Sequence, residues 1–219
     1  MRRVSAGSDS SKQSNNKVVE QKDSYLTIAE PAEAIYKERS SKFLVYAYPV
    51  ESEEEVKLHL DRLRKEFFDA THHCYAYRLG AEGEHFRAND DGEPSGTAGK
   101  PILGQLLSAQ LTNCLVVVVR YFGGTKLGVS GLIQAYKEST AEVIAASQIV
   151  EKTVDCLFEV QFPYIAMNGV QRVVKEVAPR IDRQEFDNLC TMTLRIRKSE
   201  APILESKLRK VEGVSVEIL

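Results

Sequence analysis

The stretch Arg120–Gly128, which reads R-Y-F-G-G-T-K-L-G, constrains the fold more than any other part of the chain. The unbroken apolar run Leu115–Val119 precedes it, which is typical of a strand buried on both faces. Apolar residues at helical spacing follow it, from Leu132 to Ile144. The order strand, glycine loop, helix lets backbone N–H groups point at an anion, helped by the helix dipole. The alternative is a tight turn that carries two solvated basic residues, Arg120 and Lys126.

Length and composition indicate a soluble globular protein with one large domain or two small ones. The chain has 219 residues, of which 43% are hydrophobic and 27% are charged. No apolar run is long enough to span a membrane, and the N-terminus lacks the apolar segment of a secretory signal. The four cysteines form no C-x-x-C pair. We therefore expect a cytoplasmic protein with reduced thiols and no membrane partner.

The charge is unevenly distributed along the chain. Residues 1–22 carry five basic and two acidic side chains, a net charge of +3, and their composition predicts a disordered tail. Residues 23–150 carry 13 basic and 18 acidic side chains, a net charge of −5, and residues 151–219 carry 11 of each. Neither domain has the basic excess of a non-specific nucleic-acid binder, so any such binding would be local to a cleft.

The first part of the chain, residues 23–150, mixes strands with helices. Short strands are predicted at 25–28, 34–38, 43–48 and 71–79. Ser52 and Glu55 form a capping box ahead of a helix with one buried face. His72 and His73 are neighbours on a predicted strand, so they point to opposite faces and cannot bind one metal ion together. One of them lining a polar cleft is the more plausible role.

A second glycine-rich stretch, Asp90–Gly99, reads D-D-G-E-P-S-G-T-A-G. Ser95 or Thr97 is expected to cap the helix that follows. The stretch does not match the Walker A pattern, because prolines stand at positions 94 and 101, where the pattern requires a glycine and a serine or threonine. We expect no cofactor. The three carboxylates, Asp90, Asp91 and Glu93, either bond to backbone amides in a tight turn or hold Mg²⁺ with a substrate phosphate. The turn is the favoured interpretation.

Residues 151–219 form a separate pattern. Strands are predicted at 156–162, 180–186, 189–197 and 214–218, with helices over 170–177 and after Ser199. The order β-α-β-β-α-β is that of a ferredoxin-like domain. The fold class is therefore α+β with two domains and a boundary, expected to be a short linker, near Ile149–Lys152.

Three long motifs in order make the chain resemble the IMPACT/YigZ family. They are H-C-Y-A-Y within Thr71–Arg78, the Asp90–Gly99 stretch, and Arg120–Gly128 followed by G-L-I-Q-A-Y. The resemblance implies an N-terminal domain with the fold of a small-subunit ribosomal protein and of elongation factor G domain IV. It implies a second domain similar to the ferredoxin-like last domain of that factor. Eukaryotic relatives regulate translation by relieving an inhibition that passes through an initiation-factor kinase. They carry an extra N-terminal domain that this sequence does not show.

Two functions are open at this point. The first is a non-enzymatic module of translational control that binds RNA, the ribosome or another phosphate-bearing ligand in a cleft between the two glycine stretches; a protein partner in translational control is a further alternative. Its candidate ligand-binding residues are Ser95, Gly96, Thr97, Gly99, Arg120, Tyr121, Gly123, Gly124, Lys126, Gly128 and Tyr136. The residues expected to line a polar cleft are His72, His73, Asp90, Asp91 and Glu93. The second is a metal-assisted hydrolase or phosphoryl-transfer enzyme built on the three carboxylates. Binding is favoured, because no nucleophile–base pair stands at a legible spacing.

Overall fold

The computed structural model describes residues 23–219, so the tail predicted over residues 1–22 lies outside the described part. The first part of the chain contains seven strands and three helices. They are β1 Ser24–Ile28, β2 Ala32–Glu38, β3 Ser41–Pro49, α1 Glu53–Glu66, β4 His72–Leu79, β5 His85–Asn89, α2 Gly99–Ser108, β6 Cys114–Tyr121, α3 Gly128–Ala146 and β7 Ile149–Thr153. The second part contains β8 Asp155–Pro163, the short 3₁₀ turn η1 Tyr164–Ala166, α4 Met167–Val177, β9 Arg180–Glu185, β10 Leu189–Arg197, α5 Ala201–Leu208 and β11 Ser215–Ile218.

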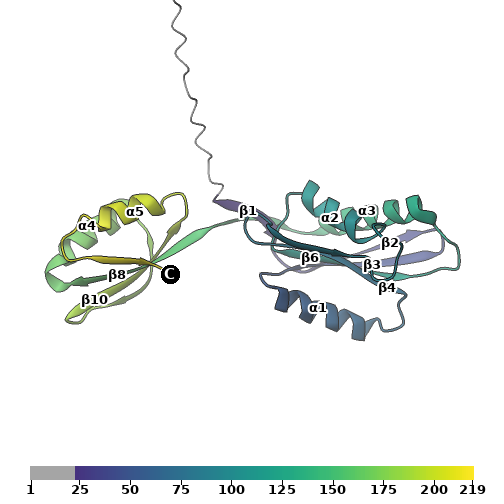
Figure 1. The fold of residues 1–219 in the computed structure, drawn as a ribbon, viewed down its shortest axis with the longest axis horizontal. Coiled ribbons are helices and arrows are strands. Elements are labelled where there is room, and N and C mark those ends of the chain that lie inside the picture. Colours follow the sequence, from purple (N-terminus) through teal and green to yellow (C-terminus); the bar gives the residue numbers. More distant parts are fainter. Residues whose placement is uncertain (1–22) are drawn as a thin grey trace, which may run out of the picture.

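A five-stranded sheet in the order β2-β3-β6-β4-β5 forms the centre of the first part, and all its neighbours are antiparallel. Helices α2 and α3 cover one face and α1 covers the other (Figure 1). The central strand β6 has both faces buried, because Val116 and Val118 pack in the core with α2 and α3 while Val117 and Val119 pack in the core with α1. The predicted strand buried on both faces is confirmed.

The antiparallel pairing brings distant segments to one edge of this sheet. Strands β5 and β6 both pair antiparallel with β4, so they run in the same direction and end at the same edge. Strands β3 and β4 begin at that edge. The two glycine stretches, which follow β5 and β6, therefore emerge side by side at this edge.

The second part is a four-stranded antiparallel sheet in the order β11-β8-β10-β9, with α4 and α5 on one face (Figure 1). Its core contains Phe158, Val160 and Phe162 from β8, which are fully buried. The predicted βαββαβ order is confirmed.

The connection between the two parts differs from the expected linker. Residues 149–153 form β7, which pairs antiparallel with β1 over its whole length. Strand pairing satisfies the backbone of this segment, so it is a structured two-stranded ribbon. Each part has its own apolar core. Independent folding of the two domains stays a prediction. Among residues 23–219, no helix is both long and apolar enough to cross a membrane.

Candidate functional site

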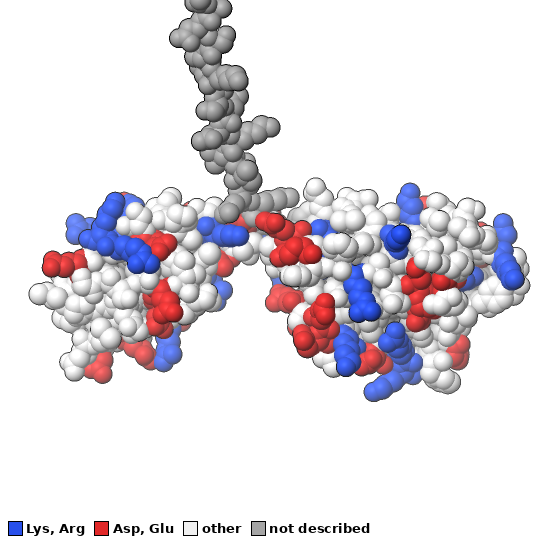
Figure 2. Space-filling view, viewed as in Figure 1, with Lys and Arg blue, Asp and Glu red and all other residues white. Residues whose placement is uncertain are grey.

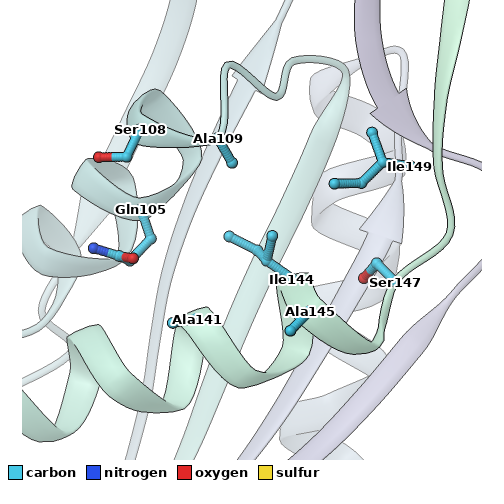
Figure 3. Close-up of a pocket in the computed structure, with 8 residues that line it drawn as sticks. All are labelled: Gln105, Ser108, Ala109, Ala141, Ile144, Ala145, Ser147 and Ile149. Atoms are coloured by element: carbon cyan, nitrogen blue, oxygen red, sulfur yellow. The ribbon is translucent and has the colours of Figure 1, made fainter.

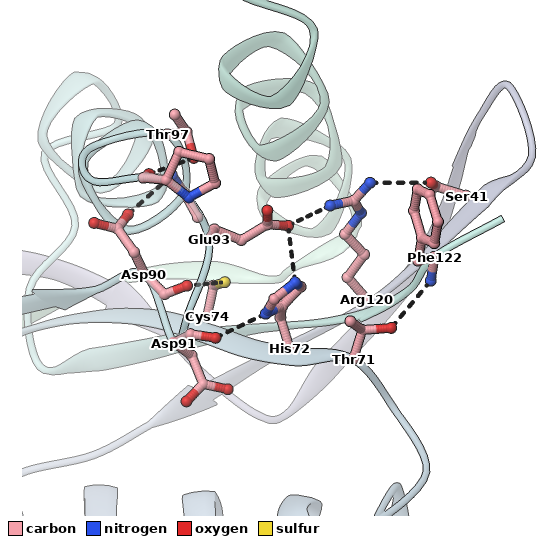
Figure 4. A network of polar contacts seen from close by, with 12 residues as sticks. Ser41, Thr71, His72, Cys74, Asp90, Asp91, Glu93, Thr97, Arg120 and Phe122 are labelled. Atoms are coloured by element: carbon pink, nitrogen blue, oxygen red, sulfur yellow. Dashed lines mark hydrogen bonds and ion pairs between the residues drawn. The ribbon is translucent and has the colours of Figure 1, made fainter. Parts of the chain in front are cut away.

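The edge at which β5 and β6 end carries a connected set of polar side chains (Figure 4). Glu93, from the stretch after β5, meets Arg120, from the end of β6, at 2.5 Å between Oε1 and Nη1. The two glycine stretches therefore converge in space, as a binding site between them requires. The arrangement follows from strand direction, not from any local sequence signal.

Arg120 is a buried cation whose charge is balanced by Glu93, although its Nε atom has no hydrogen-bond partner within the described residues. Only 4% of it is exposed, and Glu93 is 8% exposed. Its Nη2 donates to Ser41 Oγ at 3.2 Å, and its guanidinium carbon lies 5.5 Å from the Phe43 ring and 5.6 Å from the Phe122 ring. In a buried ion pair such as that of Glu93 and Arg120, each charge neutralises the other. The sequence-based expectation that Arg120 contacts a ligand phosphate is corrected: its charge is already neutralised by Glu93.

Tyr136 belongs to the same network from the inside. It is completely buried, donates from its hydroxyl to Glu93 Oε1 at 2.8 Å, and has its Oη 3.2 Å from Cys74 Sγ. Burial, and then the neighbouring Cys74 and Glu93, raise the pKa of this phenol, which stays protonated and acts as a donor. A base or sugar cannot stack on a ring that has no exposed surface, so Tyr136 is a core residue and not the ligand contact that we expected.

His72 and His73 point to opposite faces of β4, as predicted. The Nδ1 atom of His72 lies 2.8 Å from the Asp91 carbonyl oxygen, so it carries a proton and donates. This leaves Nε2 facing Glu93 Oε1 at 3.8 Å. His73 lies on the other face, with its ring packed toward α1, and burial lowers its pKa.

Asp90 fills the amide cradle at the start of α2. Its carboxylate accepts from the backbone N–H groups of Gly96 at 2.8 Å, Ala98 at 3.0 Å and Gly99 at 2.8 Å. Burial acts to raise the pKa of Asp90, but these three amides and Lys100 outweigh it, and the pKa is lowered. The helix amides that a ligand anion would use are therefore occupied by the protein's own carboxylate.

The predicted capping by Ser95 or Thr97 is wrong. The N-cap position is Ala98, which makes no side-chain hydrogen bond, and the Thr97 hydroxyl donates to the Pro94 carbonyl oxygen at 2.7 Å. Ser95 is exposed. Asp90 provides the cap from eight to nine residues upstream, which a search for local capping motifs does not detect.

The three carboxylates of the stretch do not converge (Figure 4). Asp90 bonds to the α2 amides, Glu93 bonds to Arg120, and Asp91 Oδ2 accepts from the His73 backbone N–H at 2.6 Å. Within residues 23–219, no group of three or more His, Cys, Asp or Glu side chains has the geometry to hold a metal ion. The alternative of a Mg²⁺ site formed by these three carboxylates is contradicted by their directions.

The second glycine loop, Phe122–Leu127, is open. Its residues are exposed except Leu127, and Lys126 makes no hydrogen bond or ion pair within the described residues. Backbone N–H groups from Gly123 to Leu127 have no acceptor in that part of the chain, and the N-cap of α3 makes no side-chain bond. Gly123 passes so close to the β2–β3 turn that a Cβ atom would lie 1.8 Å from the Ser40 carbonyl oxygen. Only glycine fits there.

The remaining predicted residues of this loop border the open segment. Tyr121 is half-buried at the end of β6 and its hydroxyl donates to Asp69 Oδ1 at 2.8 Å. Gly124 and Gly128 have positive φ, 85° and 74°, which places the loop in a conformation that favours glycine. Ser41, Phe43 and Thr71 also shape this edge, and sequence reasoning missed them, because they reach it only through the pairing of β3 and β4 with β6.

A separate hollow of about 450 Å³ lies between the C-terminal parts of α2 and α3 and the start of β7 (Figure 3). Its lining is Gln105, Ser108, Ala109, Ala141, Ile144, Ala145, Ser147 and Ile149. None of these side chains is titratable, so the hollow offers packing surface without acid–base or nucleophilic chemistry.

Comparison with known proteins gives a consistent result over most of the chain. The Impact N-terminal domain model matches residues 39–144. The chain is 36% identical over 153 residues to the IMPACT family member YvyE of Bacillus subtilis, a match that covers 70% of each chain. It is 28% identical over 199 residues to YigZ of Escherichia coli, covering 90% of this chain and 98% of that one. A crystal structure described as that of a hypothetical protein is similar with a TM-score of 0.66 at 28% identity, covering 90% of this chain and 97% of the other.

The fold and these matches define a protein of mixed α and β structure built on an Impact N-terminal domain followed by a ferredoxin-like βαββαβ unit. The chain belongs to the IMPACT family.

Proposed function

We propose that this chain regulates translation by binding RNA through the open glycine loop, Phe122–Leu127. Membership of the IMPACT family supports the translational role, because the family resemblance of the sequence implies that eukaryotic relatives regulate translation. The proposed position of the RNA site rests on one observation. This loop presents unpaired backbone N–H groups at the start of a helix, whereas the N–H groups at the end of the Asp90–Gly99 stretch already donate to Asp90.

The chemistry of the loop favours a phosphate backbone with unpaired bases. Lys126 supplies a free positive charge, and Phe122, which is 45% exposed, presents a ring in the same loop, 5.6 Å from the guanidinium carbon of Arg120. Base stacking on such a ring combined with phosphate contact by a cation is how proteins bind single strands. Basic and acidic groups are otherwise interspersed on the face shown in Figure 2, so the attraction is local and weak.

The salt dependence follows from the pairing of Arg120. Two cations at the site would give a slope of roughly −1.4 in log K against log salt for a single strand, at about −0.7 for each contact. Because Glu93 neutralises Arg120, we expect one contact and a slope of roughly −0.7.

The test measures binding of a fluorescein-labelled single-stranded RNA by anisotropy, together with co-sedimentation on ribosomes. Lys126→Ala is expected to weaken binding alike for all sequences and to remove most of the salt dependence. The matched control is Lys57→Ala, an exposed lysine of α1 on the other face of the sheet. If Lys126→Ala and Lys57→Ala bind as tightly as the unchanged protein, the loop is not the RNA site.

A further inference from the structure

The strand β2 ends the five-stranded sheet and pairs on one side only within the described residues. It is seven residues long, and its register with β3 runs without a bulge from Ala32 to Glu38. A regular free edge of this length is a template for another strand unless something blocks it.

The turn geometry tells which backbone groups face outward. Residues Arg39 and Ser40 form a two-residue hairpin turn between the paired residues Glu38 and Ser41. In such a hairpin the flanking pair is hydrogen-bonded, and bonded and non-bonded pairs then alternate. Glu38, Tyr36, Ala34 and Ala32 thus bond toward β3. The residues between them direct their N–H and C=O groups to the free edge: Glu33, Ile35 and Lys37.

The side chains of the same three residues lie on the face of the sheet that α1 covers elsewhere, but α1 does not extend over them. Ile35 is 59% exposed. It borders a hollow of about 350 Å³ that is also lined by Leu44 and Tyr46. An apolar residue therefore stands at the centre of the free edge, with one acidic and one basic residue at equal distances on either side.

From this pattern we propose that β2 is a self-association surface, at which a second copy of this chain pairs antiparallel across a two-fold axis at Ile35. That register places Glu33 opposite the partner's Lys37 and Lys37 opposite the partner's Glu33. Ile35 faces the partner's Ile35 at the edge of the hollow. All outward backbone groups of the three residues find partners, and the two sheets become one continuous sheet of ten strands.

Two carboxylates of α3 act against this association. Glu138 and Glu142 lie near Tyr36, whose pKa is raised by burial and by these carboxylates and Glu38. The two-fold axis would bring them toward their copies, although salt screens exposed charges at such separations. The paired edge is also small, so we expect a weak dimer with a dissociation constant on the order of micromolar or above.

The test is sedimentation velocity of the full chain over a wide concentration range. Glu33→Lys or Lys37→Glu alone sets like charges opposite each other twice and is expected to weaken dimerisation by about 10- to 30-fold. An equimolar mixture of these two variants restores opposite charges at every pair and should dimerise again. Glu138→Gln/Glu142→Gln should tighten the dimer.

Glu212→Lys, a charge reversal on an exposed loop of the second domain, serves as the control and should leave the dimer unchanged. Circular dichroism checks that each variant is folded. A monomer at all concentrations, or a dimer that neither charge reversal weakens, would overturn the proposal. If the protein is a monomer, the free edge of β2 would remain available for pairing with an extended segment of another protein.

Discussion

The stretch between β5 and α2 and the loop between β6 and α3 both lead from a strand into a helix, and both contain several glycines. In the first, Asp90 bonds to three backbone N–H groups at the helix start. In the second, no carboxylate reaches the corresponding amides within the described residues, and Lys126 is exposed. One is closed by the protein itself and the other is open to a ligand.

The difference shows that a glycine-rich strand-to-helix turn does not by itself indicate an anion site. The deciding feature is whether a carboxylate of the same chain can reach the amides. The two basic residues of the Arg120–Gly128 stretch also differ, although they look alike in sequence. Arg120 pairs with Glu93 of the closed stretch, whereas Lys126 is exposed in the open loop. Substitutions in the closed stretch and in the open loop, made one at a time, test this difference.

The largest effect is expected for Arg120→Met. It leaves Glu93 buried without its cation, which typically lowers the free energy of unfolding by about 3–5 kcal/mol. The matched variant Lys126→Met removes an exposed charge and should change it by less than about 0.5 kcal/mol. Urea denaturation measures both.

A second variant isolates the ion pair. Adding Glu93→Gln to Arg120→Met removes the unpaired charge and keeps an oxygen acceptor for Tyr136. The double variant should therefore be more stable than Arg120→Met alone. If Arg120→Met and Lys126→Met have equal unfolding free energies, the ion pair of Arg120 with Glu93 does not stabilise the fold more than the exposed charge of Lys126 does.

An intermediate effect is expected for Asp90→Asn. The amide keeps one oxygen acceptor but presents an NH₂ group to the remaining N–H groups, so we expect a loss of about 1–2 kcal/mol in unfolding free energy at neutral pH. Because the pKa of Asp90 is lowered on folding, its contribution is complete above the unfolded pKa of about 3.9 and is lost as pH falls through the folded pKa. The difference in unfolding free energy between the unchanged protein and Asp90→Asn should therefore disappear at acidic pH. A gap that stays constant down to low pH would show that Asp90 does not act through its charge.

Much of the fold could be predicted from sequence because it depends on periodic patterns. The alternating and helical spacings gave the βαββαβ order of residues 151–219, and the run Leu115–Val119 gave the central strand. The segment around Glu151 was harder, because a short strand with exposed side chains has no apolar signal, and only its partner β1 makes it a strand.

The meeting of the two glycine stretches at one edge of the sheet could be predicted, but the chemistry of the side chains there could not. Of the predicted residues, Tyr136 is in the core and His73 lies on the other face of β4, and which charges are free depends on distances across the sheet. Arg120 stands 27 residues from Glu93, and Asp90 is nine residues from the amide of Gly99. Partners at these separations have no fixed spacing in sequence, so a motif cannot tell a neutralised arginine from a ligand-binding one.

A small effect on stability, and the sharpest test of the difference between the two loops, is expected for Thr125→Asp. This change places a carboxylate in the open loop, three residues before the first residue of α3. Negative charge near a helix N-terminus is favourable, so the free energy of unfolding should rise by about 0.3–1 kcal/mol or stay unchanged. The same carboxylate should occupy or repel the position of a ligand phosphate, and binding of the labelled single-stranded RNA should be lost. Thr125→Asn keeps the size of the side chain without the charge, and it should bind RNA nearly as well as the unchanged protein. If Thr125→Asp and Thr125→Asn bind RNA equally, the open amides do not receive a phosphate, and the difference between the two loops has no bearing on RNA binding.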